Sequence, residues 1–164
     1  MPMHSDMHYR TIAVEAIRRA VITEPPVPVE RLAASLGVPV REVHLPAFFS
    51  GAIIAEDGMP VALINSALGE GTRRRTLAHL LGHVLIVLAD PVESYPRNSV
   101  PNHREAEAAA SELLLPEPLV REQARKWFND HRYLARLFGV NENEMTHRMR
   151  ELGIIKARDV LWDY

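Results

Sequence analysis

The chain has 164 residues, of which 47% are hydrophobic and 24% charged, and its formal net charge at pH 7 is -2. This length and composition are typical of one globular domain, and so small a net charge gives no general attraction to nucleic acid. The absence of cysteine excludes disulfides, thiolate metal sites and cysteine nucleophiles, and it fits a reducing cytoplasm, where we expect the protein. The first residues lack a signal-peptide core and no apolar run has the length of a membrane span, so no membrane partner is expected.

The N-terminal part of the chain predicts two helices and a strand. Residues 1–7 are expected to form a flexible tail, and residues 8–21 an amphipathic helix that a proline-rich segment ends. A second helix is predicted over residues 29–36, with Gly37 as its C-cap. Residues 40–45 alternate between apolar and polar side chains, which predicts a strand.

A hairpin is predicted next, because two β-rich runs flank a favoured turn pair. The runs are residues 50–55 and 60–65, and the turn pair is Asp57-Gly58. We expect one strand of this hairpin to be an edge strand beside the helix that follows.

That helix, predicted over residues 72–88, contains a pair of histidines. His79 and His83 are four residues apart, so both imidazoles lie on one helix face, where they could share a zinc ion as in the H-E-x-x-H motif. Leu80 occupies the position of the motif's glutamate. The predicted core stripe lies on another face and consists of Leu77, Leu81, Val84, Leu85 and Leu88.

The C-terminal half predicts mostly helix. A loop over residues 89–102 is followed by a helix over 103–115 and by helical sequence over 117–138, with a break near Asn129-Asp130. The expected buried face of this last stretch consists of Trp127, Leu134, Leu137 and Phe138.

A final helix begins at Asn141 and ends at Gly153, with Glu144 in capping-box position. Residues 134–152 read as helix, turn and helix, which is similar to a helix-turn-helix, and residues 157–164 are expected to be a tail. Four side chains could then face a DNA groove: Thr146, His147, Arg148 and Arg150. Simple helical packing explains the same pattern.

The histidine pair alone has two interpretations. It is either half of a zinc site or two partly exposed helical histidines, and a zinc site needs a third protein ligand. Spacing alone leaves the third ligand open among Glu105, Glu107, Glu112 and His103.

Two motifs together resemble a known family. Residues 73–83 read R-R-R-T-L-A-H-L-L-G-H, and residues 105–116 read E-A-E-A-A-A-S-E-L-L-L-P. Together with the strand-like residues 60–65, they resemble the ImmA/IrrE family of zincin-like metallopeptidases. The family pattern is roughly R-R-R-F-T-L-A-H-E-L-G-H followed by E-A-N-x-F-A-A-E-L-L-M-P. The resemblance covers roughly residues 8–156, which we therefore expect to form one domain.

The resemblance implies an α+β, zincin-like fold, in which a small and mainly antiparallel sheet packs against several helices and the C-terminal part is helical. It also implies a bound Zn²⁺ ion, with His79, His83 and Glu105 as metal ligands. Glu107 stands where the family usually has Asn, and Ala109 where it usually has Phe.

Leu80 stands where the family has its catalytic glutamate. That glutamate takes a proton from the zinc-bound water and passes it to the leaving amine, which leucine cannot do. Another carboxylate, Glu107 or Glu112, could substitute. The sequence therefore leaves open whether the protein is an active hydrolase or a pseudoenzyme, with a degenerate, non-proteolytic member at least as well supported.

Relatives in this family act in bacterial or phage regulation, often by cleaving a helix-turn-helix repressor. The resemblance thus implies a repressor-type protein partner, bound as an extended segment along the hairpin edge. The alternative is a non-enzymatic regulatory or DNA-binding module that kept the fold. Arg73, Arg74 and Arg75, at the start of the histidine helix, are either a solvated first turn or a binding patch for an acidic partner.

Overall fold

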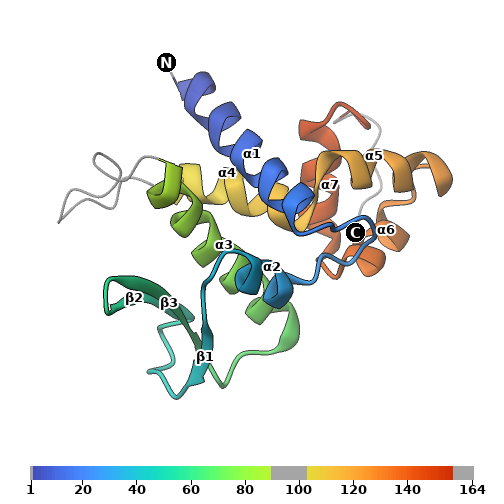
Figure 1. Cartoon of the computed structure of the whole chain (residues 1–164). Helices are drawn as coiled ribbons and strands as arrows, with labels where there is room; N and C mark the ends of the chain where they lie inside the picture. The colour runs from blue at the N-terminus through green and yellow to red at the C-terminus, as the bar shows by residue number, and fades with distance from the viewer. Residues whose placement is uncertain (1, 90–102, 157–164) are drawn as a thin grey trace. The chain divides into compact units, whose positions relative to one another are not determined.

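The computed structural model describes residues 2–89 and 103–156 of the chain, and Figure 1 shows its elements. The chain divides into two compact units, of which unit 1 is Met1–Ile22 with Pro28–Leu114, and unit 2 is Thr23–Val27 with Leu115–Tyr164. Most of the predicted loop before residue 103, and the predicted C-terminal tail, lie outside the described residues. None of the helices in the described ranges is long and apolar enough to cross a membrane.

Unit 1 combines four helices with a three-stranded sheet in the described ranges. Its elements are α1 (Pro2–Arg19), α2 (Val29–Ser35), β1 (Val40–Val43), β2 (Gly51–Glu56), β3 (Met59–Asn65), α3 (Glu70–Ala89) and α4 (His103–Leu114). α1 begins at Pro2, within the residues that the sequence predicts to be a tail. Proline is tolerated in a first helical turn, where its missing N–H would have no intrahelical partner.

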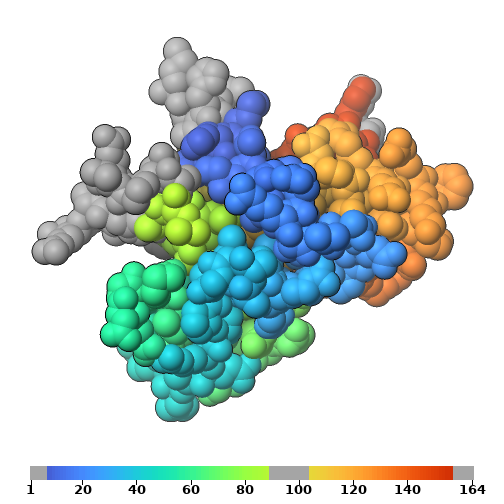
Figure 2. All heavy atoms as spheres, viewed as in Figure 1, coloured from blue at the N-terminus to red at the C-terminus, as the bar shows by residue number. Residues whose placement is uncertain are grey.

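The sheet has the strand order β1-β3-β2, so β2 is an edge strand, as predicted. The predicted hairpin is confirmed: β2 and β3 pair antiparallel around Asp57-Gly58, whose φ angles of 51° and 78° are those of a primed turn. β1 pairs with β3 in parallel, with Val40 opposite Ala62, because the segment after β1 carries the chain to the far side of β3. The sheet is therefore mixed within the predicted α+β class, and its hairpin lies at the surface of unit 1 (Figure 2).

The histidine helix α3 packs against both the sheet and α4, and α1 packs on α4. Four residues of the predicted stripe are buried, but Leu88 is 57% exposed, because the last turn of α3 extends beyond the core. The α3–α4 contact is close at Gly82, where an added Cβ would lie 2.5 Å from the carbonyl oxygen of Ala106. Glycine at this position lets α4 approach the helix that contains both histidines.

A buried asparagine organises the segment that leads into β2. The Asn65 side chain, at the end of β3, donates hydrogen bonds to the carbonyl oxygens of Leu45 (3.2 Å) and Phe49 (2.9 Å). Its oxygen accepts a hydrogen bond from the Ala67 N–H at 3.1 Å. One side chain thus fixes both the start of the edge strand and the turn before α3.

Unit 2 consists of three short helices in its described part: α5 (Glu117–Lys126), α6 (His131–Phe138) and α7 (Glu142–Glu151). Its fully buried side chains include Leu134, Phe138, Met145 and Met149. The break predicted near Asn129-Asp130 and the capping box of Asn141 with Glu144 are confirmed. Two residues of the predicted buried face are corrected: Trp127 is 37% exposed and Leu137 is half-buried, because both lie beside the turns that end α5 and α6.

Candidate functional site

The two histidines of α3 point toward one another. The Nε2 atoms of His79 and His83 are 3.0 Å apart, and their rings meet edge to face with centroids separated by 4.7 Å. Two imidazoles on a tetrahedral zinc, each with an N–Zn distance of about 2.0–2.1 Å, place their nitrogens roughly 3.3 Å apart. The pair is therefore close to the separation that a shared metal ion requires.

Glu107 of α4 reaches the opposite side of the His79 ring. Its Oε1 atom lies 2.6 Å from Nδ1 of His79, and 71% of its side chain is exposed. A metal-binding histidine commonly has a carboxylate beside its second ring nitrogen, which fixes the orientation of the ring. The position at which this chain departs from the family's Asn thus bears a carboxylate in contact with a candidate ligand.

Leu80 is buried, with 7% of its surface exposed. Its side chain packs against Gly51, the first residue of β2. A Cβ added at Gly51 would lie 3.2 Å from Leu80 Cδ1 and 3.0 Å from Thr76 Cγ2. The leucine side chain therefore contributes to the apolar contact between α3 and the edge strand. Sequence reasoning did not single out Gly51 or Thr76, although a glycine in a strand often marks such a close approach.

The third ligand is the part of the site that the structure does not assemble. Within the described residues, no group of three histidine, cysteine or acidic side chains is arranged to hold a metal ion. Glu105 of α4 is half-buried, and its Oε2 atom is buried without a hydrogen-bond partner. The side chain of His103 lies outside the described residues, and Glu112 is buried in α4. The donor types fit zinc, because two facing imidazoles and a carboxylate oxygen without a hydrogen-bond partner are present.

Of the three arginines at the start of α3, Arg73 and Arg74 are half-buried and Arg75 is exposed. Arg73 is only 19% exposed, and its guanidinium contacts Glu30 of α2 and Glu42 of β1, the latter through Nε at 2.7 Å. Hydrogen bonds to Glu42 and Glu30 raise the pKa of Arg73. Arg73 therefore connects three elements of unit 1, which explains a basic residue at a helix start better than a binding patch does.

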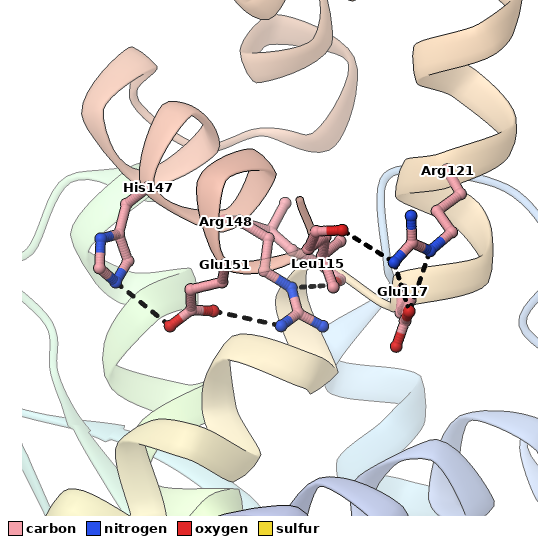
Figure 3. A network of polar contacts seen from close by, with 7 residues as sticks. Leu115, Glu117, Arg121, His147, Arg148 and Glu151 are labelled. Atoms are coloured by element: carbon pink, nitrogen blue, oxygen red, sulfur yellow. Dashed lines mark hydrogen bonds and ion pairs between the residues drawn. The ribbon is translucent and has the colours of Figure 1, made fainter. Parts of the chain in front are cut away.

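Two of the four side chains considered for DNA contact are buried in unit 2. Arg148 donates to the Leu115 carbonyl oxygen at 3.0 Å and lies 3.3 Å from Glu151 (Figure 3), while the Thr146 hydroxyl donates to the Glu142 carbonyl oxygen at 2.6 Å. Only 2% of Arg148 and 1% of Thr146 are exposed. The proposed DNA-facing role of these two residues is corrected, because α7 uses both for internal packing.

Comparison with known families identifies the class of domain. The IrrE N-terminal-like domain (Peptidase_M78) matches residues 32–150, a range that begins within α2 and ends within α7. The chain therefore belongs to this family, in agreement with the resemblance read from its sequence.

The chain is also similar to a solved structure described as a Mycobacterium tuberculosis transcriptional regulator. The TM-score is 0.65 and the sequence identity 20%, and the match covers 88% of this chain and 46% of that one. At this identity the likeness shows the zincin-like fold, and the chain spans about half the length of that regulator. A comparison with curated proteins gave no significant match.

Proposed function

We propose that this protein is an IrrE-like regulatory domain whose peptidase centre is impaired or lost, and that it acts through a repressor-type protein partner. One observation carries the proposal. Leu80, between the two candidate ligands, is buried against β2 in the position where the family places its general base. The side chain is apolar and packed, so it supplies no proton acceptor to the face occupied by the imidazoles.

The proposed metal is zinc, held by His79 and His83, with Glu105 as the third ligand. When bound, zinc lowers the pKa of its water and polarises a carbonyl group. The Nε2 separation of 3.0 Å and the unsatisfied Glu105 oxygen support this assignment. Glu107 keeps the His79 ring in place rather than serving as the base, because its carboxylate lies at Nδ1, on the far side of the ring from Nε2.

The proposed docking element is the free edge of β2. An edge strand presents unpaired backbone N–H and C=O groups, which an extended segment can bind by adding a strand to the sheet. β2 packs beside α3 through Gly51 and Leu80, so a segment bound at this edge would lie close to the histidine pair. This arrangement suits recognition of a protein chain whether or not the chain is then cut. The burial of Thr146 and Arg148 makes the DNA-binding alternative the weaker one.

The experiment compares zinc-loaded wild type with Leu80→Glu and with Leu80→Gln in the cleavage of a helix-turn-helix repressor. We expect little or no cleavage by the wild type and a gain with Leu80→Glu. The gain should be a part of the ~10²–10⁴-fold that general acid–base catalysis supplies.

Leu80→Gln is the matched control, because it has the size and polarity of glutamate without its basicity. Equal activity of the Glu and Gln variants would show that packing at Gly51, not proton transfer, limits the reaction. Rapid cleavage by the wild type would refute the loss of the peptidase centre and point to a different base.

A further inference from the structure

The turn between α5 and α6 in unit 2 presents an aromatic side chain outward. Phe128 is 93% exposed, and its φ of 55° lies in the left-handed region. The next residue, Asn129, has a φ of 59°. Asparagine tolerates this conformation, but for a bulky residue such as phenylalanine it is strained and uncommon. Folding alone would favour glycine or asparagine at position 128, so the phenylalanine requires another explanation.

Hydrogen bonds on both sides fix this turn. The Asn129 N–H donates to the Ala124 carbonyl oxygen at 2.8 Å, and the Asp130 N–H donates to the Trp127 carbonyl oxygen at 3.1 Å. Asp130 also caps α6 by accepting a hydrogen bond from the Tyr133 N–H. The backbone of the turn is therefore held in one conformation that directs Phe128 outward, which lowers the backbone entropy lost when a partner binds there.

Trp127 and two cationic residues, Arg125 and Lys126, directly precede Phe128 in the chain. Trp127 stacks on Tyr133 with ring centroids 4.6 Å apart, and the Lys126 ammonium lies 5.7 Å from the centre of the Trp127 ring. Arg125 and Arg132 are exposed on the same helix pair. Over residues 117–138, five lysines or arginines stand against three carboxylates. Arg121 pairs with Glu117, Arg132 lies 3.9 Å from Glu142 and Asp130 is engaged in the cap, so Arg125 and Lys126 are the cations that the turn offers to a partner. Aromatic residues and arginine are the side chains that most often dominate protein interfaces.

We infer that the α5–α6 turn is a protein-docking surface, in which Phe128 inserts among apolar side chains of an acidic protein segment. The cations of the turn, Arg125 and Lys126, provide the charge complementarity. A protein segment is favoured over nucleic acid because a single outward ring at a turn suits insertion among apolar side chains, whereas nucleic-acid strands stack successive bases on aromatic rings along a basic groove. This surface belongs to unit 2, and its role depends neither on the metal site nor on the β2 edge.

The test selects phage-displayed random twelve-residue peptides on the full chain and measures the Kd of synthetic selected peptides by fluorescence anisotropy. We expect the selected sequences to be net negative and to contain a large apolar residue. Phe128→Asn should weaken their binding at least about tenfold, the loss typical of an interface hot spot. Arg125→Glu should weaken it as well.

Phe48→Asn is the matched control, because Phe48 is an 80% exposed phenylalanine in unit 1 without a positive φ. It should leave the Kd within twofold of the wild type. Phe128→Asn should not lower the melting temperature, since asparagine suits the left-handed turn, so lost binding cannot be attributed to unfolding.

Three kinds of result would overturn the proposal. The first concerns the peptides: a selection without acidic preference, or an equal loss of peptide binding in Phe128→Asn and Phe48→Asn. The second is tighter, Phe128-dependent binding of a dT20 oligonucleotide, which would make the surface a nucleic-acid site. The third is a Phe128-dependent dimer in light scattering, which would make the partner a second copy of the chain.

Discussion

At the scale of single residues, the contact between Glu107 and His79 is the feature of the site that is most open to test. The carboxylate lies 2.6 Å from the ring nitrogen that faces away from His83. Such partners orient a ligand, and their removal typically costs ~10–100-fold in metal affinity. We therefore expect Glu107→Ala to weaken zinc binding by about that factor in a calorimetric titration.

Glu107→Gln separates position from charge, because glutamine keeps a hydrogen-bonding oxygen but not the negative charge. We expect it to fall between the wild type and Glu107→Ala. Glu122→Ala, which removes an exposed carboxylate from α5, is the control and should leave zinc affinity unchanged. Equal zinc affinity of the wild type and both Glu107 variants would show that the contact does not position the ligand.

Individual residues also show where sequence reasoning succeeded. The turn at Asp57-Gly58 and the cap at Asn141 follow from local backbone chemistry, which a sequence displays directly. Leu88 and Trp127 are predicted to be buried but are exposed. Periodicity identifies the apolar face of a helix, but not how far the elements that pack against that face extend along it. The burial of Arg148 was missed since its acceptor is a backbone carbonyl 33 residues away.

At the scale of elements, the closeness of α3 and α4 depends on Gly82. A Cβ there would lie 2.5 Å from a carbonyl oxygen, and a backbone atom cannot move away easily. We expect Gly82→Ala to destabilise the protein by about 1–3 kcal/mol, the usual cost of overpacking. The measurement is urea unfolding followed by circular dichroism.

Gly71→Ala is the matched control, since Gly71 is in the same helix and an added Cβ there meets nothing within 4 Å. Alanine has the higher helix propensity, so this change should stabilise the protein by up to about 1 kcal/mol. If both substitutions stabilise equally, the two helices have room to separate, and Gly82 does not set their distance.

Arg73 joins α3 to α2 and β1, and its contribution should depend on pH. Partial burial acts to raise the pKa of Glu30. This effect is outweighed by the hydrogen bond from Arg73, a backbone hydrogen bond and the charges of Arg73 and Arg74, so the pKa of Glu30 is below its ordinary value. A carboxyl group with a lowered folded-state pKa stabilises the fold above its unfolded pKa, and this stabilisation is lost as the pH falls through the folded value. The contribution should therefore be full at pH 7 and decline below about pH 4.3.

Arg73→Met tests this argument because methionine keeps most of the apolar stem and removes the charge. We expect a loss of about 1–2 kcal/mol at pH 7, a modest value since both carboxylates are half exposed. The difference from wild type in urea unfolding should shrink toward pH 3. A difference that is constant between pH 7 and pH 3 would mean that packing of the stem, and not the ion pairs, supplies the stability.

At the scale of the whole molecule, family membership and fold were predictable because two motifs of fixed spacing identify them together. The proposed metal site was predictable only in part. The i, i+4 spacing places two imidazoles together on one helix, but the proposed third ligand, Glu105, belongs to α4, whose position depends on tertiary packing at Gly82 and Ala106. The parallel β1–β3 pairing was missed for a similar reason, since strand order depends on the path of the connection after β1.

Zinc binding should be visible in the stability of the whole molecule, because a ligand that binds only the folded state stabilises that state. At a free zinc concentration 100 times the Kd, the gain is about 2.7 kcal/mol, and a chelator should remove it. We expect zinc to raise the melting temperature of wild-type protein in differential scanning calorimetry.

Zinc should have no effect on the melting temperature of His79→Ala or His83→Ala, each of which removes one of the two facing imidazoles. His147→Ala, which removes an exposed histidine paired with Glu151 on α7, is the control and should respond to zinc like the wild type. If all three variants respond equally, zinc binds elsewhere in the chain, and the histidine pair of α3 is a structural contact rather than a metal site.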